Sequence, residues 1–299
     1  MVNYVTDFPA RRPRIALFGA GRVAQQLAPA LLAAGHELVF LSSRTAAAAE
    51  ALAARLAPRP PVLTDLPPVL PAADVYLLAV PDAAVASLLA NTAWPAGAVV
   101  AHMAGALPLS VFAAAPGVRG GVFYPLQTFS AGREVEWKTV PFFIEGVDAA
   151  TENLLLELAH SLSAQVQMLL SADRLRLHVG AVFANNFTNH LLGISHELLT
   201  DANLPFGLLA PLIRETVDKA LSQPPFDAQT GPAVRQDAPT LAAHHVALAA
   251  RPAWQQLYAK ITASIQARQQ GSKPTPMPPV SEADQMAGPP LQAPALPLS

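Results

Sequence analysis

The chain of 299 residues contains 52% hydrophobic and only 13% charged residues, which excludes a disordered or coiled-coil protein and allows one large domain or two ordinary ones. Its formal net charge is −2, and no run of lysine and arginine is present, so nothing indicates a nucleic-acid partner. The absence of cysteine excludes disulfides, thiolate metal ligands and cysteine nucleophiles.

The longest uncharged stretch, residues 83–118, contains prolines and glycines that divide it into pieces too short to cross a bilayer. No signal peptide is evident near the N-terminus. We therefore expect a cytoplasmic protein with no membrane partner.

The first half of the sequence alternates short apolar runs with amphipathic stretches. This alternation is typical of an α/β fold whose doubly wound, mostly parallel sheet is covered by helices on both faces. Strands are predicted at 14–18, 37–41, 62–63, 75–80, 98–102, 118–123 and 140–144, and helices at 23–34, 45–56 and 83–90.

The pattern changes after residue 170 to helical spacing alone, which predicts an all-α C-terminal domain. Helices are expected at 173–200, 210–221, 238–250 and 253–269, and the last stretch, 271–299, holds eight of the thirty prolines. The predicted organisation is a nucleotide-binding domain over 1–170, a helical domain over 171–270, and a disordered proline-rich tail over 271–299.

A glycine-rich turn follows the first predicted strand and opens the first predicted helix. Gly19 permits a tight turn, Gly21 lets backbone N–H groups approach a pyrophosphate, and Ala24 allows close helix–strand packing. Ala20, Arg22 and Val23 complete the predicted dinucleotide-binding segment, and the helix N-terminus favours the phosphate charge.

The second predicted strand ends in Ser42, Ser43 and Arg44. An NAD-specific site places a carboxylate here to bond the ribose 2′-hydroxyl. Two hydroxyls and a guanidinium favour a 2′-phosphate, so NADP(H) is the expected cofactor. Ser43 and Arg44 can also cap the following helix, a role compatible with phosphate binding.

Five motifs in the order of a known family cover the chain to about residue 270. They are GAGRVA (19–24), LLAVPD (77–82), GVFYPLQTF (121–129), HVGAVFANNFTNHL (178–191) and GPAVRQDAPTLAAHH (231–245). The chain resembles Rossmann-like proteins that carry the C-terminal domain of unknown function 2520 (DUF2520). These belong with pyrroline-5-carboxylate reductase, the β-hydroxyacid dehydrogenases and the F420-dependent NADP oxidoreductases. We count Ala79, Val80 and Pro81 of the second motif among the cofactor-binding residues.

Candidate catalytic residues lie on the long predicted helix, where Asn185 and Asn189 follow His178 by seven and eleven residues, so that the three share one face of an α-helix. In the related β-hydroxyacid dehydrogenases this helix carries a lysine as proton donor, and asparagines then orient the substrate. No lysine stands between Lys138 and Lys219, so we predict that His178 donates the proton. The alternative is a polar cluster within a helical interface.

Further side chains are candidates for contacts with the ligands. His102 follows the fifth strand and is expected near the nicotinamide or its ribose. Gln127 is a possible amide contact, or else solvated, and Tyr124 stands where many relatives have histidine, which argues against catalysis there. Arg235 is placed to clamp a substrate carboxylate, with His244 nearby, or else to form an ion pair between domains or subunits. The spacing of histidines and carboxylates predicts no metal site.

Together these features predict an NADP(H)-dependent oxidoreductase that transfers hydride to or from a small C=O or C=N substrate. An imine or pyrroline-carboxylate reductase and a non-catalytic NADPH-binding sensor or scaffold are the alternatives. The resemblance also implies a homodimer formed through the helical domain.

Overall fold

The computed structural model describes residues 12–130 and 132–271. Its contacts divide the chain into two compact units, one ending at Ala181 and the other beginning at Val182. The predicted domain limits remain predictions, and apart from Gly271 the predicted tail lies outside the described residues. No helix within the described part of the chain is long and apolar enough to cross a membrane.

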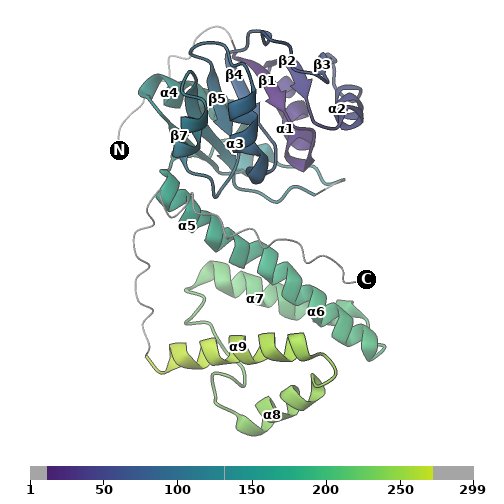
Figure 1. Cartoon of the computed structure of the whole chain (residues 1–299). Coiled ribbons are helices and arrows are strands. Elements are labelled where there is room, and N and C mark those ends of the chain that lie inside the picture. Colours follow the sequence, from purple (N-terminus) through teal and green to yellow (C-terminus); the bar gives the residue numbers. More distant parts are fainter. Residues whose placement is uncertain (1–11, 131, 272–299) are drawn as a thin grey trace, which may run out of the picture. The chain divides into compact units, whose positions relative to one another are not determined.

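An eight-stranded sheet in the order β3-β2-β1-β4-β5-β6-β7-β8 forms the first unit (Figure 1). Strands β1 to β6 are parallel, β7 is antiparallel to β6, and β8 is parallel to β7. The predicted mostly parallel α/β sheet is therefore confirmed. The strands are β1 (Arg14–Phe18), β2 (Glu37–Ser42), β3 (Val62–Leu63), β4 (Val75–Leu78), β5 (Val99–His102), β6 (Arg119–Pro125), β7 (Phe142–Gly146) and β8 (Val166–Met168).

Both faces of the sheet are covered, as the doubly wound fold requires. In β1, Ile15 and Leu17 belong to one core cluster, with helices α1 (Arg22–Ala33), α2 (Ala46–Ala53) and α4 (Ala149–Leu162). Ala16 and Phe18 point to the opposite cluster, with α3 (Asp82–Asn91) and the short 3₁₀ helix η1 (Leu109–Ala114). Burial on both faces explains why these strands are continuous apolar runs in the sequence.

Helix α4 and strand β8 are the elements that the sequence analysis missed. Asp148 begins α4, and its carboxylate accepts a hydrogen bond of 2.8 Å from the backbone N–H of Thr151. This N-cap is a recognisable start signal. Leu155 and Leu158 bury the inner face of the helix against the sheet.

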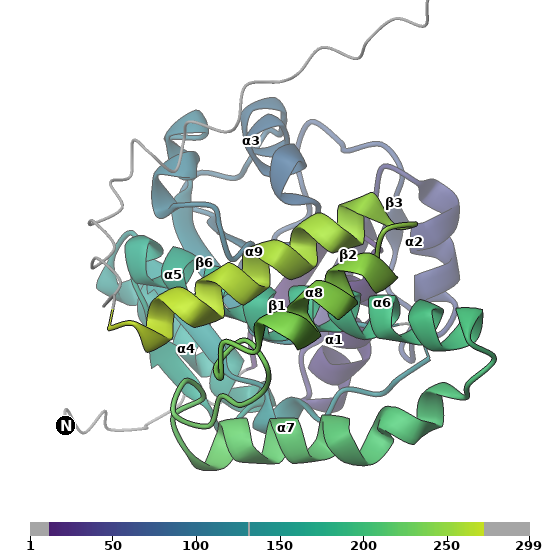
Figure 2. The same ribbon diagram turned by 90° about the horizontal axis from the view of Figure 1, so that it is seen from below.

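The second unit is helical, as predicted, and contains α6 (Thr188–Asp201), α7 (Ala210–Ser222), α8 (Ala238–Ala247) and α9 (Pro252–Gln269). Helices α8 and α9 lie side by side in both views (Figures 1 and 2). The predicted single helix over 173–200 is not uniform, because a π-helical turn over Val182–Phe187 separates α5 (Ser171–Ala181) from α6.

Helix α5 is fastened to the sheet by buried polar bonds. The guanidinium of Arg174 pairs with the carboxylate of Glu145 on β7, with 1% and 7% of the two side chains exposed. Arg174 also donates to the backbone oxygen of Leu107, in the segment after β5. The backbone N–H and hydroxyl of Ser171 donate to Glu145 at 3.1 and 2.7 Å. Burial lowers the pKa of Arg174, and the charge of Glu145 opposes that shift.

Substituting Glu145→Gln leaves the buried guanidinium without its counter-charge. We expect the free energy of unfolding to fall by about 3–5 kcal/mol, measured by urea denaturation. Glu50→Gln, which breaks the exposed pair of Glu50 with Arg59, is the control and should cost less than about 1 kcal/mol. Equal losses in the two variants would contradict the anchoring role of Glu145.

Candidate functional site

The glycine-rich turn, which begins at Gly19, lies between the carboxyl ends of β2 and β4. Gly19 has φ of +109°, and a Cβ built on it would lie 2.1 Å from the backbone oxygen of Ala79. Its N–H donates to the backbone oxygen of Ser42 over 2.7 Å. Both the conformation and the space therefore require glycine at this position.

Gly21 has a different reason to be glycine. It is the N-cap of α1, and a Cβ there would meet no protein atom within 4 Å. No side chain caps the helix and no acidic residue lies in its first turn, which begins with Arg22 and Val23. Among the described residues, therefore, no side chain caps the N–H groups of this first turn, an arrangement that fits the pyrophosphate of a dinucleotide.

The end of β2 supplies two hydroxyls and one cation, as predicted. Ser42 is buried, and Ser43 accepts a hydrogen bond of 3.3 Å from the backbone N–H of Thr45, at the start of α2. Arg44 is exposed and makes no hydrogen bond or ion pair with the described residues. The N-cap of α2 is Thr45, which has no side-chain cap hydrogen bond, so Ser43 bonds the chain just before the helix and does not cap it. The guanidinium of Arg44 is available to a ligand.

An imidazole, a phenol and a carboxylate gather near this edge of the same unit. The hydroxyl of Tyr124, at the end of β6, lies 3.0 Å from Nδ1 of His178 on α5. Asp82 opens α3 directly after Ala79, Val80 and Pro81, and its charge interacts with both rings. The end of β4 therefore connects the glycine-rich turn with this group of side chains.

The electrostatics of the group keep Tyr124 neutral. Burial raises the pKa of Tyr124 to about 12, and the nearby charge of Asp82 acts in the same direction while Arg174 opposes it. Burial also raises the pKa of Asp82, although the charge of His178 lowers it. The phenol therefore stays a hydroxyl at neutral pH, able both to donate and to accept a hydrogen bond.

His102 lies inside the protein rather than on the open edge. Its ring is fully buried and stacks on Phe112, with ring centroids 5.8 Å apart. Nδ1 accepts a hydrogen bond of 3.2 Å from the backbone N–H of Ala104, and burial lowers the pKa of His102 to about 3. Strand alternation turns the ring toward η1, so we do not carry the predicted nicotinamide contact of His102 into the proposed site.

The predicted shared face of His178, Asn185 and Asn189 does not follow from the observed helix. Asn185 lies in the π-helical turn, where the 100° step of an α-helix does not hold, so spacings of seven and eleven residues no longer imply one face. Asn185 and Asn189 are exposed and belong to the second unit. Their role in substrate orientation stays a prediction.

The weaker substrate candidates are dispersed. Gln127 is exposed, and its side-chain oxygen accepts a hydrogen bond of 2.7 Å from the N–H of Thr128. In the second unit, Arg235 is exposed, and Nδ1 of His244 lies 2.8 Å from the hydroxyl of Tyr258. His244 borders an apolar cavity of about 420 Å³ in that unit. No group of metal ligands occurs among residues 12–130 and 132–271.

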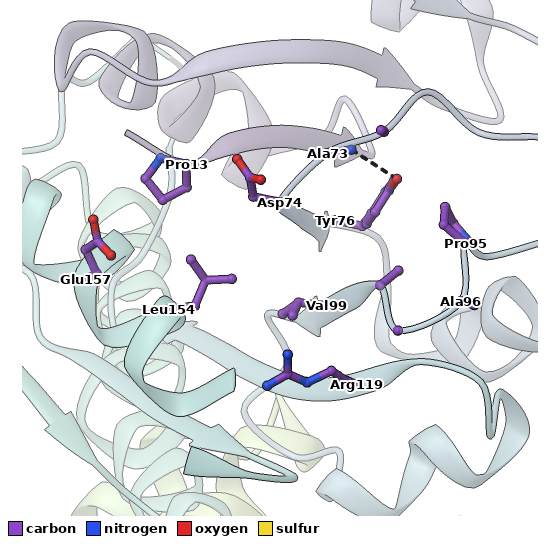
Figure 3. Close-up of a pocket in the computed structure, with 13 residues that line it drawn as sticks. Pro13, Ala73, Asp74, Tyr76, Pro95, Ala96, Val99, Arg119, Leu154 and Glu157 are labelled. Carbon is purple, nitrogen blue, oxygen red and sulfur yellow. Dashed lines mark hydrogen bonds between the residues drawn. The ribbon is translucent and has the colours of Figure 1, made fainter. Parts of the chain in front are cut away.

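A separate cavity of about 450 Å³ opens beside the beginnings of β4, β5 and β6 (Figure 3). Asp74 there accepts a bond of 2.7 Å from the N–H of Arg14, and Arg119 pairs with Asp148. Parallel sheets bind ligands at the carboxyl ends of their strands, which is the opposite edge. We therefore place the candidate site at the glycine-rich turn and His178.

Sequence reasoning found His178 but missed what surrounds it. The sequence argues against catalysis at Tyr124, where many relatives carry histidine, and assigns no role to Asp82. Tyr124 and Asp82 each stand where a strand of the parallel sheet ends or has just ended, a position from which side chains reach the ligand edge. Their position at the end of a parallel strand was therefore the sequence signal that could have identified both residues.

Two family models match the chain: a Rossmann-like domain over residues 3–126 and the domain of unknown function 2520 over residues 140–265. A solved structure from Bacteroides fragilis, of a protein named as a proposed NADP oxidoreductase, is 39% identical, with a TM-score of 0.78 over 86% of this chain and 99% of that one. No protein among the curated sequences matches.

More distant structures share the fold. A pyrroline-5-carboxylate reductase from Streptococcus pyogenes is 15% identical, with a TM-score of 0.54 over 86% of this chain and 99% of that one. A reductive aminase from Aspergillus terreus, solved with NADPH and ethyl-5-oxohexanoate, is 20% identical, with a TM-score of 0.59 over 88% and 94%. At these identities the likeness shows the fold alone.

The two glycines of the turn should respond differently to alanine. Gly19→Ala forces Cβ onto the oxygen of Ala79 at a positive φ and should lower the free energy of unfolding by about 1–3 kcal/mol or more. Gly21→Ala places its methyl group in open space and should change stability by less than about 1 kcal/mol. Thermal or urea unfolding measures both, and a Gly21→Ala loss as large as that of Gly19→Ala would contradict the geometry.

Proposed function

This chain belongs to the family that joins a Rossmann-like domain to the domain of unknown function 2520, and from that premise we propose that it is an NADP(H)-dependent oxidoreductase acting on a small C=O or C=N substrate. The observation that carries the proposal is the connection of an open glycine-rich turn to His178 and Tyr124 through the end of β4. The relative from Bacteroides fragilis, named as a proposed NADP oxidoreductase, supports the choice of cofactor.

In the proposed reaction the first turn of α1 and Gly21 hold the pyrophosphate, and Ser42, Ser43 and Arg44 receive the 2′-phosphate. When bound to these residues, NADPH would supply the hydride that reduces the carbonyl or imine carbon. As the C=O or C=N bond becomes single, the imidazolium of His178 gives its proton to the oxygen or nitrogen. In the reverse direction the neutral imidazole accepts that proton.

The contributions of the remaining candidates belong to the same proposal. Asn185 and Asn189 orient the substrate, and Gln127, Arg235 and His244 contact it. These assignments rest on residue type and on the family resemblance.

One observation favours the imine alternative over a keto acid. The charge beside His178 and Tyr124 is the carboxylate of Asp82, which stabilises a cationic iminium or amine. Its repulsion of a substrate carboxylate disfavours a keto acid and a pyrroline-carboxylate alike, so the preference is for an imine without a carboxylate beside Asp82. The nearby cation Arg174 is buried against Glu145 and is not free to bind an acid. The side chains that the first unit contributes to the site therefore favour reduction of a C=N bond.

Substitution of Arg44 tests whether the site prefers NADP(H) to NAD(H). Removal of its guanidinium in Arg44→Ala should weaken NADPH binding about tenfold or more, because a charge-assisted bond to the 2′-phosphate is lost, and leave NADH binding nearly unchanged. Calorimetric titration measures both constants. Arg119→Ala, at the beginning of β6, is the matched control. Equal weakening of NADPH and NADH in Arg44→Ala would contradict the 2′-phosphate role.

Substitution of His178 tests whether its imidazole is the proton donor. His178→Ala should lower kcat about 100-fold to 10,000-fold on whichever member of a panel of cyclic imines and 2-oxo acids is turned over, while NADPH binding persists. His160→Ala, an exposed histidine of α4, is the control. Nearly intact turnover in His178→Ala would refute the assignment. Tight NADPH binding without turnover of any panel member would favour the sensor or scaffold alternative.

We also propose that the chain forms a homodimer through its helical unit. Among the described residues of this unit, Ala233 and Leu248 are the buried hydrophobic ones, whereas large apolar side chains such as Leu221 (83% exposed) and Val246 (72% exposed) face outward. A second copy would remove this surface from water. Sedimentation equilibrium should give twice the 31.3 kDa of one chain, and a monomer throughout the concentration range would contradict the dimer.

A further inference from the structure

The contact between Tyr124 and His178 joins two elements that are far apart in sequence. Tyr124 is the penultimate residue of β6 and is 8% exposed. His178 lies on α5, and its ring meets the phenol edge to face with 6.0 Å between centroids. The hydroxyl lies 3.0 Å from Nδ1. Nδ1 is therefore engaged in a contact with the protein, and Nε2 is the ring nitrogen that remains for a substrate.

The space for this contact depends on Gly105, in the segment after β5. A Cβ at Gly105 would lie 2.4 Å from Nδ1 of His178 and 2.9 Å from Cζ of Tyr124. Since Gly105 has no φ in the left-handed region, its backbone conformation does not require glycine. Glycine is required here because a Cβ would collide with the rings of His178 and Tyr124.

We propose that Tyr124, in the space left by Gly105, is a positioning residue that holds Nδ1 of His178 and so makes Nε2 the atom that exchanges a proton with the substrate. This inference rests on the proposed function, because it assigns an atom to the proton transfer proposed for His178. Tyr124 itself neither gains nor loses a proton in the reaction.

The proton balance is compatible with this arrangement. In the imidazolium, Nδ1–H donates to the Tyr124 oxygen and Nε2–H is directed away from the phenol. When Nε2 gives its proton to the product oxygen or nitrogen, the neutral ring keeps the Nδ1 proton and the same hydrogen bond. The ring therefore need not reorient during the transfer. The charge of Asp82 interacts with both residues of this pair, and the charge of Arg174 interacts with Tyr124.

The experiment measures the ring of His178 directly in the full-length protein. Imidazole ¹⁵N–¹H correlation spectra, assigned with His178→Gln, should show a hydrogen-bonded Nδ1 in the wild type. Tyr124→Phe removes the hydroxyl and should shift the Nδ1 resonance and mix the two tautomers. Gly105→Ala keeps both rings but forces them apart and should produce a similar change.

Tyr76→Phe is the matched control. Tyr76 is also buried, and its hydroxyl donates to the backbone oxygen of Pro71 over 2.9 Å, within the first unit but at the cavity of Figure 3. This variant should leave the resonances of His178 unchanged. Identical His178 resonances in wild type, Tyr124→Phe and Gly105→Ala would overturn the proposal.

Kinetics provide the second readout. With a turned-over substrate, Tyr124→Phe should lower kcat about threefold to tenfold, the value of one hydrogen bond, with little change in KM for the substrate or in NADPH binding. An increase in KM at constant kcat would instead make Tyr124 a binding residue and overturn the proposal. If the wild-type protein does not bind NADPH, the proposed function is refuted. The tautomer measurement then still decides whether Tyr124 holds Nδ1 of His178.

Discussion

The position of the candidate proton donor depends on the buried ion pair between Arg174 and Glu145. Ser171 and Arg174 are the two buried residues of α5, and both bond to Glu145. The helix is thus held by directional polar bonds in addition to the packing of Leu177 on the cluster of Val122, Tyr124 and Phe143, and His178 follows Arg174 by one helical turn. Because an unpaired buried charge is so costly, the pair tolerates little displacement, and this restraint keeps the imidazole at Tyr124.

A second constraint comes from the sheet edge. The parallel strands end together, so turns that are distant in sequence are close in space. Gly19 touches the backbone of Ala79, and three residues later Asp82 begins α3 beside the rings of Tyr124 and His178. The proposed phosphate-binding and proton-transfer groups are therefore connected through one short segment. Changes in the segment after β4 should affect both binding and chemistry.

Much of the fold was predictable because its signals are local. The apolar strands, the glycine-rich turn and the final helices follow from patterns within a few residues, and the alternation of strands and helices indicates a mostly parallel sheet. The π-helical turn over Val182–Phe187 has no such pattern. The pairs Tyr124–His178 and Arg174–Glu145 join residues 54 and 29 positions apart, so spacing along one helix could not reveal them. The sequence places His102 at the carboxyl end of a strand but does not show on which face of the sheet its ring lies, and in the structure the ring is buried against Phe112.

Hydrogen–deuterium exchange with and without NADPH tests the central claim that the cofactor lies across the carboxyl ends of the strands. The account predicts slower exchange of backbone amides in residues 19–23, 42–45 and 79–82, with no change in residues 72–74 and 97–99 beside the cavity of Figure 3. Protection confined to 72–74 and 97–99, or no protection at saturating NADPH, would contradict it.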